Sequence, residues 1–191
     1  MWGDLTDPLP HKLSALLAVN GVKVGVRGGT MPAELTRLSS AELSISPTAR
    51  RGPADAPRTL PVNGPLDRAK FAATLALTDD PKPLSLTAAE CGLTLTGTPR
   101  PDGTVTVRCQ WAVQHGESRP RWTPTAAGGF DRTEARTAEA FPTLDFEVTL
   151  APDEVLVIGP TDKADGTLGA TFFLTPDGTK QRAAVIRAAG Q

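Results

Sequence analysis

Alternating apolar and polar residues in the second half of the chain predict β-strands. From Thr143 to Leu150 and from Thr104 to Val113, every second residue is apolar, and most residues between them are polar or charged. Because successive side chains of a strand point to opposite faces of a sheet, each stretch predicts a strand with one buried and one solvated face. The predicted buried face holds Val105, Val107, Cys109, Trp111, Val113, Leu144, Phe146, Val148 and Leu150.

Turn residues divide this half of the chain and predict a mainly antiparallel sheet. Pro101-Asp102-Gly103 is typical of a tight reversal. The Asp-Gly-Thr tripeptides that begin at Asp102, Asp165 and Asp177 are therefore interpreted as turns, because their spacing does not supply the oxygen ligands of a calcium site. The expected strands cover residues 69–77, 84–87, 92–98, 104–113, 144–150, 155–158, 171–174 and 182–186. Residues 116–129 interrupt the alternation and predict a long loop that leads to a further strand or short helix.

The N-terminal part has a different pattern. A helix is predicted up to Val19 and is ended by Gly21; a strand over 22–26, a turn at Gly28-Gly29, a helix over 32–39 and a strand over 43–45 follow. Residues 47–65 are rich in proline, which is typical of a connection. The predicted fold class is α+β: a small N-terminal α/β unit over residues 1–46, a Pro-rich connection over 47–65, and a mainly antiparallel β-sandwich or curved sheet over 66–191. We expect the N-terminal unit to pack on the β domain or on a neighbouring copy.

Composition and charge narrow the classes of partner. The 191 residues carry a net charge of -1, with acidic and basic residues interspersed, and contain no tyrosine. Binding to nucleic acid is therefore not expected, because it requires a basic surface and often aromatic stacking. No apolar run approaches the roughly 20 residues of a transmembrane helix, and the first residues do not form a secretory signal. The chain is expected to be cytoplasmic, unless a leader has been removed.

The two cysteines, Cys91 and Cys109, flank the turn at Pro101 to Gly103. Pairing of the strands around this turn places Cys109 nearer Thr94 than Cys91. A disulfide between Cys91 and Cys109 would then require a bulge that corrects the register, and the alternative is a pair of free buried thiols. The sequence leaves both possibilities open.

Four segments, in order, resemble the secretin family of outer-membrane channel proteins. GLTLTGTP from Gly92 with DGTVTV from Asp102 is similar to the family's strand pair "G-V-x-L-x-V-x-P … D-G-x-V-x-L". FEVTL from Phe146 with VLVIG from Val155 is similar to the pair that ends in "V-I-G-G", with Pro160 at the second glycine. LGATFF from Leu168 resembles "L-G-x-L-F", and residues 181–188 resemble the closing strand.

The resemblance spans residues 92–188 and implies a protein of a bacterial secretion or pilus machine in the cell envelope. Secretins assemble into rings, so self-association or protein partners are implied. The N-terminal unit is similar to the small ring-building domains that precede the channel in that family. Between the two strand pairs, we expect none of the long amphipathic hairpins of a membrane-crossing lip. The resemblance then implies a secretin-like domain without the pore.

No arrangement of residues predicts catalysis, a cofactor or a bound metal. His11 and His115 have no metal-ligand spacing. His115 could act as a general base oriented by Glu117 or Asp145, but no nucleophile is placed beside it. Cys91 lies among apolar strand residues, where a thiol is usually inert. Gly28-Gly29 lacks the lysine and the glycine spacing of a phosphate loop. We therefore expect a protein that is not an enzyme.

One exposed cluster is predicted to make contacts. Arg119, Arg121 and Trp122 lie in the predicted loop, and an indole near guanidinium groups is a common contact surface for a protein or a glycan. Alternatively, Trp122 folds back and caps the open end of the sheet.

These observations favour a non-catalytic structural or interaction domain of a bacterial envelope assembly, located in the periplasm or at the outer membrane if a leader has been removed. A second hypothesis is a monomeric β-sandwich that binds a ligand or glycan through the loop around Trp122. A third, an enzyme that uses His115, has the least support. The sequence does not indicate which small ligand, if any, is bound.

Overall fold

The smaller of two antiparallel sheets contains strands from both ends of the sequence. The computed structural model describes residues 3–29, 56–124, 128–175 and 177–187, without the side chain at position 133. Strands β1 (Val22–Arg27), β7 (Val155–Pro160) and β8 (Ala184–Arg187) pair in the order β1-β7-β8. All residues of β7 are buried, because β7 is the central strand and is covered on both faces.

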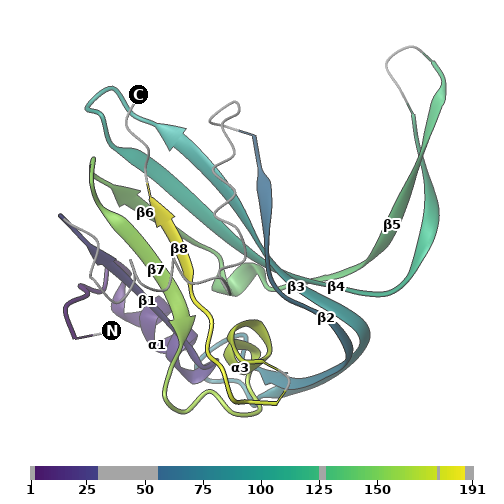
Figure 1. The fold of residues 1–191 in the computed structure, drawn as a ribbon, viewed down its shortest axis with the longest axis horizontal. Coiled ribbons are helices and arrows are strands. Elements are labelled where there is room, and N and C mark those ends of the chain that lie inside the picture. Colours follow the sequence, from purple (N-terminus) through teal and green to yellow (C-terminus); the bar gives the residue numbers. More distant parts are fainter. Residues whose placement is uncertain (1–2, 30–55, 125–127, 176, 188–191) are drawn as a thin grey trace.

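The larger sheet contains five strands and curls away from the smaller one (Figure 1). Strands β2 (Arg58–Ala73), β3 (Lys82–Pro99), β4 (Val105–Pro124) and β5 (Phe130–Ala140) pair in that order, and every pair is antiparallel. Strand β6 (Phe146–Leu150) pairs with the first part of β4. The predicted fold class, α+β with a mainly antiparallel sandwich or curved sheet, is confirmed.

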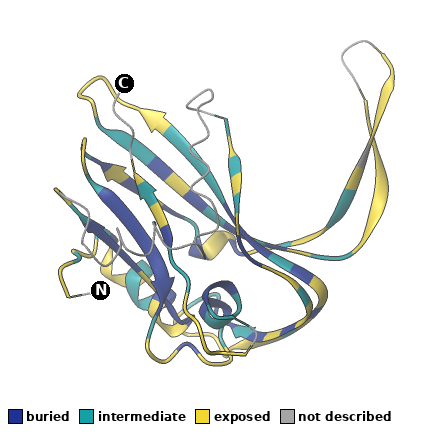
Figure 2. Cartoon of the chain, viewed as in Figure 1, coloured by how far each residue is buried: buried dark blue, intermediate teal, exposed yellow. Residues whose placement is uncertain are grey.

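The two sheets share one hydrophobic core. Val24 and Ile158 enter this core from the small sheet, and Val107 and Val148 enter it from the large sheet. Helices α1 (His11–Val19) and α3 (Leu168–Phe173) and the short helix η1 (Pro142–Leu144) also contribute buried side chains. Figure 2 shows that the buried residues concentrate where the sheets and helices meet.

Trp111 on β4 is surrounded by aromatic rings. Its ring centroid lies 5.1 Å from that of Phe172, 6.1 Å from that of Phe173 and 6.5 Å from that of Phe146. Trp111 is 1% exposed, and its indole Nε1 has no hydrogen-bond partner among the described residues. The contacts with Phe172 and Phe173 connect α3 to the large sheet.

The alternation of apolar and polar residues predicted the buried face correctly. All predicted members of that face are buried except Val105, which is partly buried and packs against the core. The reversal between β3 and β4 also lies at the predicted turn, where Gly103 has a φ of 83°.

Three expectations about individual elements are wrong. Residues 58–65 form the first half of β2, although their prolines predicted a connection, because an edge strand tolerates a proline that lacks a donor. Residues 84–87 and 92–98 belong to one continuous strand, β3. Residues 171–173 belong to α3, where a strand was predicted.

The N-terminal predictions are confirmed for the elements that the structure describes. Helix α1 and strand β1 match the predicted helix and strand, and they contribute Leu16, Leu17, Val22 and Val24 to the shared core. The predicted helix over 32–39 and strand over 43–45 lie outside the described residues.

Candidate interaction site

A two-stranded arm projects from the large sheet. Pairing of β3 with β4 ends at Gln114, whereas β4 continues to Pro124 with only β5 beside it. We call residues 116–124 of β4 and 130–136 of β5 the arm. Figure 1 shows that the arm extends well away from both sheets and from the helices.

A bend at the base sets the direction of the arm. The β4–β5 register shifts between His115 and Arg119, which adds two residues on the β4 side, and Gly116 adopts a φ of 74° within this shift. The Arg136 guanidinium donates to the Gly116 carbonyl (3.1 Å) and to the Glu90 carboxylate on β3 (3.3 Å). Because a bulge bends the strand that carries it, and Arg136 connects this bulge to β3, the base of the arm is held in a defined orientation.

The outer part of the arm is exposed on both faces (Figure 2). Trp122 is 61% exposed and Phe130 is 68% exposed, values that are unusual for large apolar side chains. The register pairs Pro124 with Phe130 and Trp122 with Arg132. Since directly opposed residues of an antiparallel pair share a face, Trp122, Pro124 and Phe130 lie on the same face, and we call these three residues the apolar face of the arm.

The predicted contact cluster is exposed but divided between the two faces. Arg119 and Arg121 are odd-numbered residues of β4, so they lie on the face opposite Trp122. The expectation that the indole and these guanidinium groups form one cluster is therefore wrong. Its alternative, that Trp122 caps the sheet, is also wrong, because Trp122 is 61% exposed on the projecting arm.

Residues 116–124 of the predicted loop belong to β4, and residues 119–124 pair with β5, so the prediction of a loop is wrong for this part. This stretch therefore contains a hairpin, exposed on both faces, that the sequence did not predict. Sequence reasoning missed Phe130 and Pro124, although the alternation of Pro120, Trp122 and Pro124 with Arg119, Arg121 and Thr123 was a signal of a strand.

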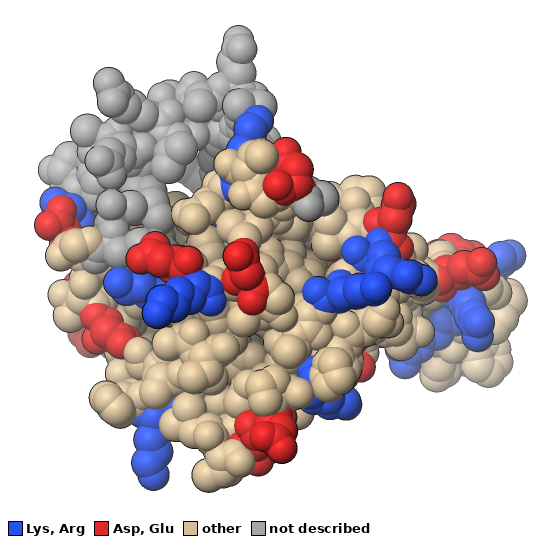
Figure 3. All heavy atoms as spheres, turned by 90° about the horizontal axis from the view of Figure 1, so that it is seen from below, with Lys and Arg blue, Asp and Glu red and all other residues tan. Residues whose placement is uncertain are grey.

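Charged side chains of both signs lie on the arm. Arg132 forms an ion pair with Glu134 at 3.2 Å, and the Ser118 hydroxyl lies 3.1 Å from the same carboxylate. Figure 3 shows basic and acidic side chains next to one another on the lobe at the right, which corresponds to the arm. The arm therefore combines an apolar face with compensated charge, so it does not present a single-sign surface.

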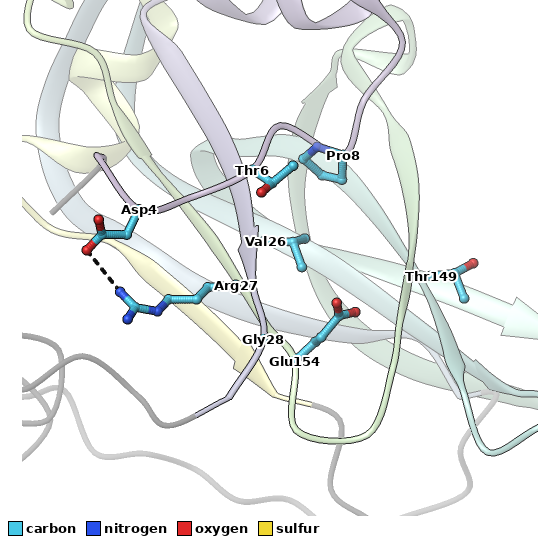
Figure 4. Close-up of a pocket in the computed structure, with 8 residues that line it drawn as sticks. All are labelled: Asp4, Thr6, Pro8, Val26, Arg27, Gly28, Thr149 and Glu154. Atoms are coloured by element: carbon cyan, nitrogen blue, oxygen red, sulfur yellow. Dashed lines mark hydrogen bonds and ion pairs between the residues drawn. The ribbon is translucent and has the colours of Figure 1, made fainter.

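A second candidate is the hollow between the N-terminal segment and the β6–β7 turn (Figure 4). It measures 340 Å³ and is lined partly by Asp4, Arg27 and Glu154. Asp4 and Arg27 form an ion pair at 3.1 Å, and Glu154 accepts a hydrogen bond from the Ala151 backbone at 2.7 Å. The arm is the stronger candidate because Trp122 and Phe130 are exposed on it, whereas the charged groups of this hollow bond to partners within the protein.

The cysteines do not form the disulfide that the sequence left open. Both are free and buried; Cys91 lies opposite Val113, and Cys109 lies opposite Leu95. Val113 and Cys109 are four positions apart, which corresponds to about 13 Å along a strand. A disulfide requires Cα atoms within about 7 Å, and no bulge shifts the β3–β4 register between the two cysteines. The alternative of two free buried thiols is correct.

Neither thiol is expected to react while the protein is folded. Burial raises the pKa of both Cys91 and Cys109 to about 12, with smaller contributions from Glu90 and Asp145 respectively. In a native alkylation experiment at pH 8, we expect intact mass spectrometry to show no adduct, and two adducts after denaturation. Between pH 9.0 and about 12, unfolding would release protons that the folded thiols retain, so the free energy of unfolding should fall across this window. Rapid native alkylation would contradict the burial of the thiols.

The other residues considered for chemistry do not assemble into a reactive site. His115 lies on β4 opposite Thr137, and Asp145, proposed to orient it, instead accepts hydrogen bonds from Gln110 and the Trp111 backbone. His11 is exposed at the start of α1. Within residues 3–29, 56–124, 128–175 and 177–187, no group of three or more His, Cys, Asp or Glu side chains could hold a metal ion.

The Asp-Gly-Thr tripeptides form turns, as predicted. Asp102 accepts hydrogen bonds from the backbone and hydroxyl of Thr104, and Asp177 accepts them from Thr175 and Thr179. These bonds stabilise the charged form, so the pKa of Asp102 is lowered and the pKa of Asp177 is lowered to about 2. The glycines that follow Asp102, Asp165 and Asp177 all have positive φ.

None of the described helices is long and apolar enough to cross a bilayer. No protein-family model, curated protein or solved structure matches this chain.

Proposed function

We propose that this protein is a non-catalytic structural or interaction domain of a bacterial envelope assembly, and that the arm is its principal contact element. Two independent features support the proposal. The sequence of residues 92–188 resembles the secretin family in four ordered segments. The arm provides a projecting surface that the packing of the two sheets does not require.

The exposed apolar face of the arm is the observation that carries this proposal. Trp122 and Phe130 are 61% and 68% exposed on a ribbon that extends away from the body. Exposed aromatic side chains of this size gain free energy when a partner removes them from water, and tryptophan and arginine are enriched at the energetic centres of protein interfaces. The arm offers both residue types within a few positions.

Association with the envelope is part of the proposal. The secretin resemblance favours a location in the periplasm or at the outer membrane and an assembly that contains several copies. In this role the two sheets are the scaffold, while the arm engages a neighbouring subunit or another protein of the assembly.

An arm-deleted variant tests the proposal. His115 and Thr137 are directly opposite each other, so replacing residues 116–136 with Asn-Gly would join them by a two-residue hairpin turn. The two sheets should keep their strand content, because the core lies outside the arm. In the native host, we expect the tagged wild-type chain to sediment from the envelope fraction in a particle much larger than 20.0 kDa. The arm-deleted chain should be lost from that particle.

Point variants test whether the apolar face itself, and not any change of exposed apolar residues, is responsible for the association. Replacing Trp122 and Phe130 together with alanine should weaken the association by roughly tenfold or more, as expected for aromatic residues central to an interface. A matched control replaces Val19 and Leu77, which are 52% and 51% exposed on the body, with alanine and should leave the particle unchanged. A wild-type chain found only as a 20.0 kDa species in every fraction would contradict the proposal.

The exposure of Trp122 also supports the second candidate, a monomeric module that binds a glycan. Sugars commonly stack on exposed indole rings, and Arg132 lies directly opposite Trp122 as a potential hydrogen-bond donor. A glycan array would distinguish this role. Binding to a glycan that is lost in Trp122→Ala, by a chain that stays monomeric, would favour the second candidate over the first.

A further inference from the structure

Strand β5 forms an open edge of the large sheet. Among the described strands it pairs only with β4. Its sequence, FDRTEARTAEA, contains neither proline nor glycine. Along the other edge of the arm, Pro120 and Pro124 interrupt the row of backbone donors of β4. Since proline on an edge strand blocks further pairing, β5 is the edge of the arm that can accept another strand.

The outer arm also lacks the support that a stable β-ribbon usually has. Beyond the bulge, six residue pairs, Arg119–Ala135 through Pro124–Phe130, hold the two strands together, and no third strand of the described chain joins them. A two-stranded ribbon exposed on both faces is marginally stable in water, whereas three or more strands stabilise one another. Addition of a strand along β5 would provide this support.

We propose that β5 pairs antiparallel with β5 of a second copy of this chain, with Thr133 of each copy on the two-fold axis. This inference rests on the proposed function, because it identifies a partner for the arm. The result is an isologous interface in which the same edge is used by both copies. A continuous four-stranded sheet, in the order β4-β5-β5-β4, would form between two bodies.

The charges of β5 select this register. A two-fold axis normal to the sheet pairs one residue of each copy when the two residues lie equally far from the axis along β5, on opposite sides of it in the sequence. With Thr133 at the centre, Arg132 of each copy lies opposite Glu134 of the other, and Asp131 lies opposite Ala135. This register contains two pairs of unlike charge and no pair of like charge, an arrangement that stabilises neighbouring strands.

The neighbouring registers all oppose like charges. An axis at residue 131, 132, 134 or 136 places a charged side chain opposite its own copy, and an axis at Ala135 offsets two favourable Glu134–Arg136 pairs with two Asp131–Glu139 pairs of like charge. Directly opposed like charges destabilise a sheet, so the register centred on Thr133 is preferred among those centred on residues 131–136. In that register, Phe130 and Trp122 of both copies lie on the same face of the four-stranded sheet, because the axis preserves the face.

Single-cysteine variants test the register directly. Two residues 133 on the axis would have Cα atoms about 5 Å apart, within the range that a disulfide spans. Thr133→Cys should therefore form a covalent dimer under mild oxidation, seen on a non-reducing gel. The native thiols are buried and should not interfere. Ala135→Cys and Thr137→Cys are matched controls, because their Cα atoms would be more than 10 Å from the equivalent residue of the second copy. A stronger cross-link at either control position, or none at position 133, would overturn the proposal.

Charge variants test the interface without cysteine chemistry. Glu134→Arg should weaken the dimer by roughly tenfold or more in sedimentation equilibrium, because both Arg132–Glu134 pairs become pairs of like charge. The double variant R132E/E134R exchanges the charges and should restore association. If the single and double variants dimerise as the wild type does, or if the wild-type chain stays monomeric up to about 100 μM, the proposed pairing is wrong.

The two proposals can fail separately. If the purified chain is monomeric but the arm-deleted variant is lost from the large envelope particle, the β5 pairing is wrong and the interaction role stands. If residue 133 cross-links efficiently but the arm-deleted variant remains in the particle, the pairing stands and the arm is not the contact element of the assembly.

Discussion

Replacing Trp111 with alanine is expected to lower the free energy of unfolding by about 3 to 5 kcal/mol, the range seen when a large buried aromatic side chain is truncated. Trp111 is 1% exposed and packs against Phe172 and Phe173 of α3. Alanine would leave a cavity between the large sheet and α3, since the rings that surround Trp111 are held by separate elements. The measurement is urea denaturation monitored by far-UV circular dichroism.

Trp111→Phe is the informative control for this prediction. The indole Nε1 is buried and has no hydrogen-bond partner in the described part of the chain, which costs free energy in the folded state. Phenylalanine keeps most of the ring contacts and removes this unsatisfied donor, so it should cost much less than alanine. If phenylalanine and alanine were equally destabilising, the aromatic packing around Trp111 would not be the source of the stability.

The sequence predicted elements best where one face is buried and the other is solvated. On β4 and β6 this condition holds, and the alternation from Val105 to Val113 and from Leu144 to Leu150 identified the core face correctly. It fails for the outer arm, where both faces are exposed. Only the short run from Arg119 to Pro124 alternates there, and its two prolines together with the preceding Gly116 favour a loop over a strand.

Helix α3 shows a different reason for failure. The segment LGATFF contains adjacent aromatic residues and a threonine, which favour a strand locally. Its buried residues are Leu168, Gly169, Phe172 and Phe173, a spacing of three to four residues that fits one face of a helix. Thr167 provides the N-cap by accepting a hydrogen bond from the Ala170 backbone. A window of six residues was too short for this periodicity to outweigh the local preference.

The contact site could be predicted only in part. The sequence left open whether Trp122 is exposed near arginines or caps the sheet, and the structure places it 61% exposed. The division of Arg121 from Trp122 between two faces follows from the strand conformation of β4, whereas the proximity of Phe130 depends on the β4–β5 register. That register follows the bulge at Gly116, whose position the local sequence did not reveal.

Gly169→Ala is expected to destabilise the protein by about 3 kcal/mol or more, through overpacking where α3 meets the turn after α1. A methyl group at Gly169 would overlap the backbone carbonyl of Gly21. The Gly169 amide also donates to the Asn20 carbonyl at 2.8 Å, so the turn cannot move away without losing this hydrogen bond. Asn20 is itself fixed, because its buried side-chain amide bonds to the backbone of Leu16 and Thr74.

Gly169 of α3 contacts the turn after α1, and Asn20 in that turn bonds to Thr74 beyond the end of β2. Disruption of this contact should therefore destabilise the whole body of the protein. Urea denaturation of Gly169→Ala should show a lower midpoint, and Gly3→Ala, where no atom lies within 4 Å of the added methyl group, should match the wild type. The arm lies outside this contact, so a destabilised but folded Gly169→Ala chain should still cross-link through Thr133→Cys. A loss below about 1 kcal/mol would mean that the turn at Asn20 and Gly21 can adjust, which its buried hydrogen bonds argue against.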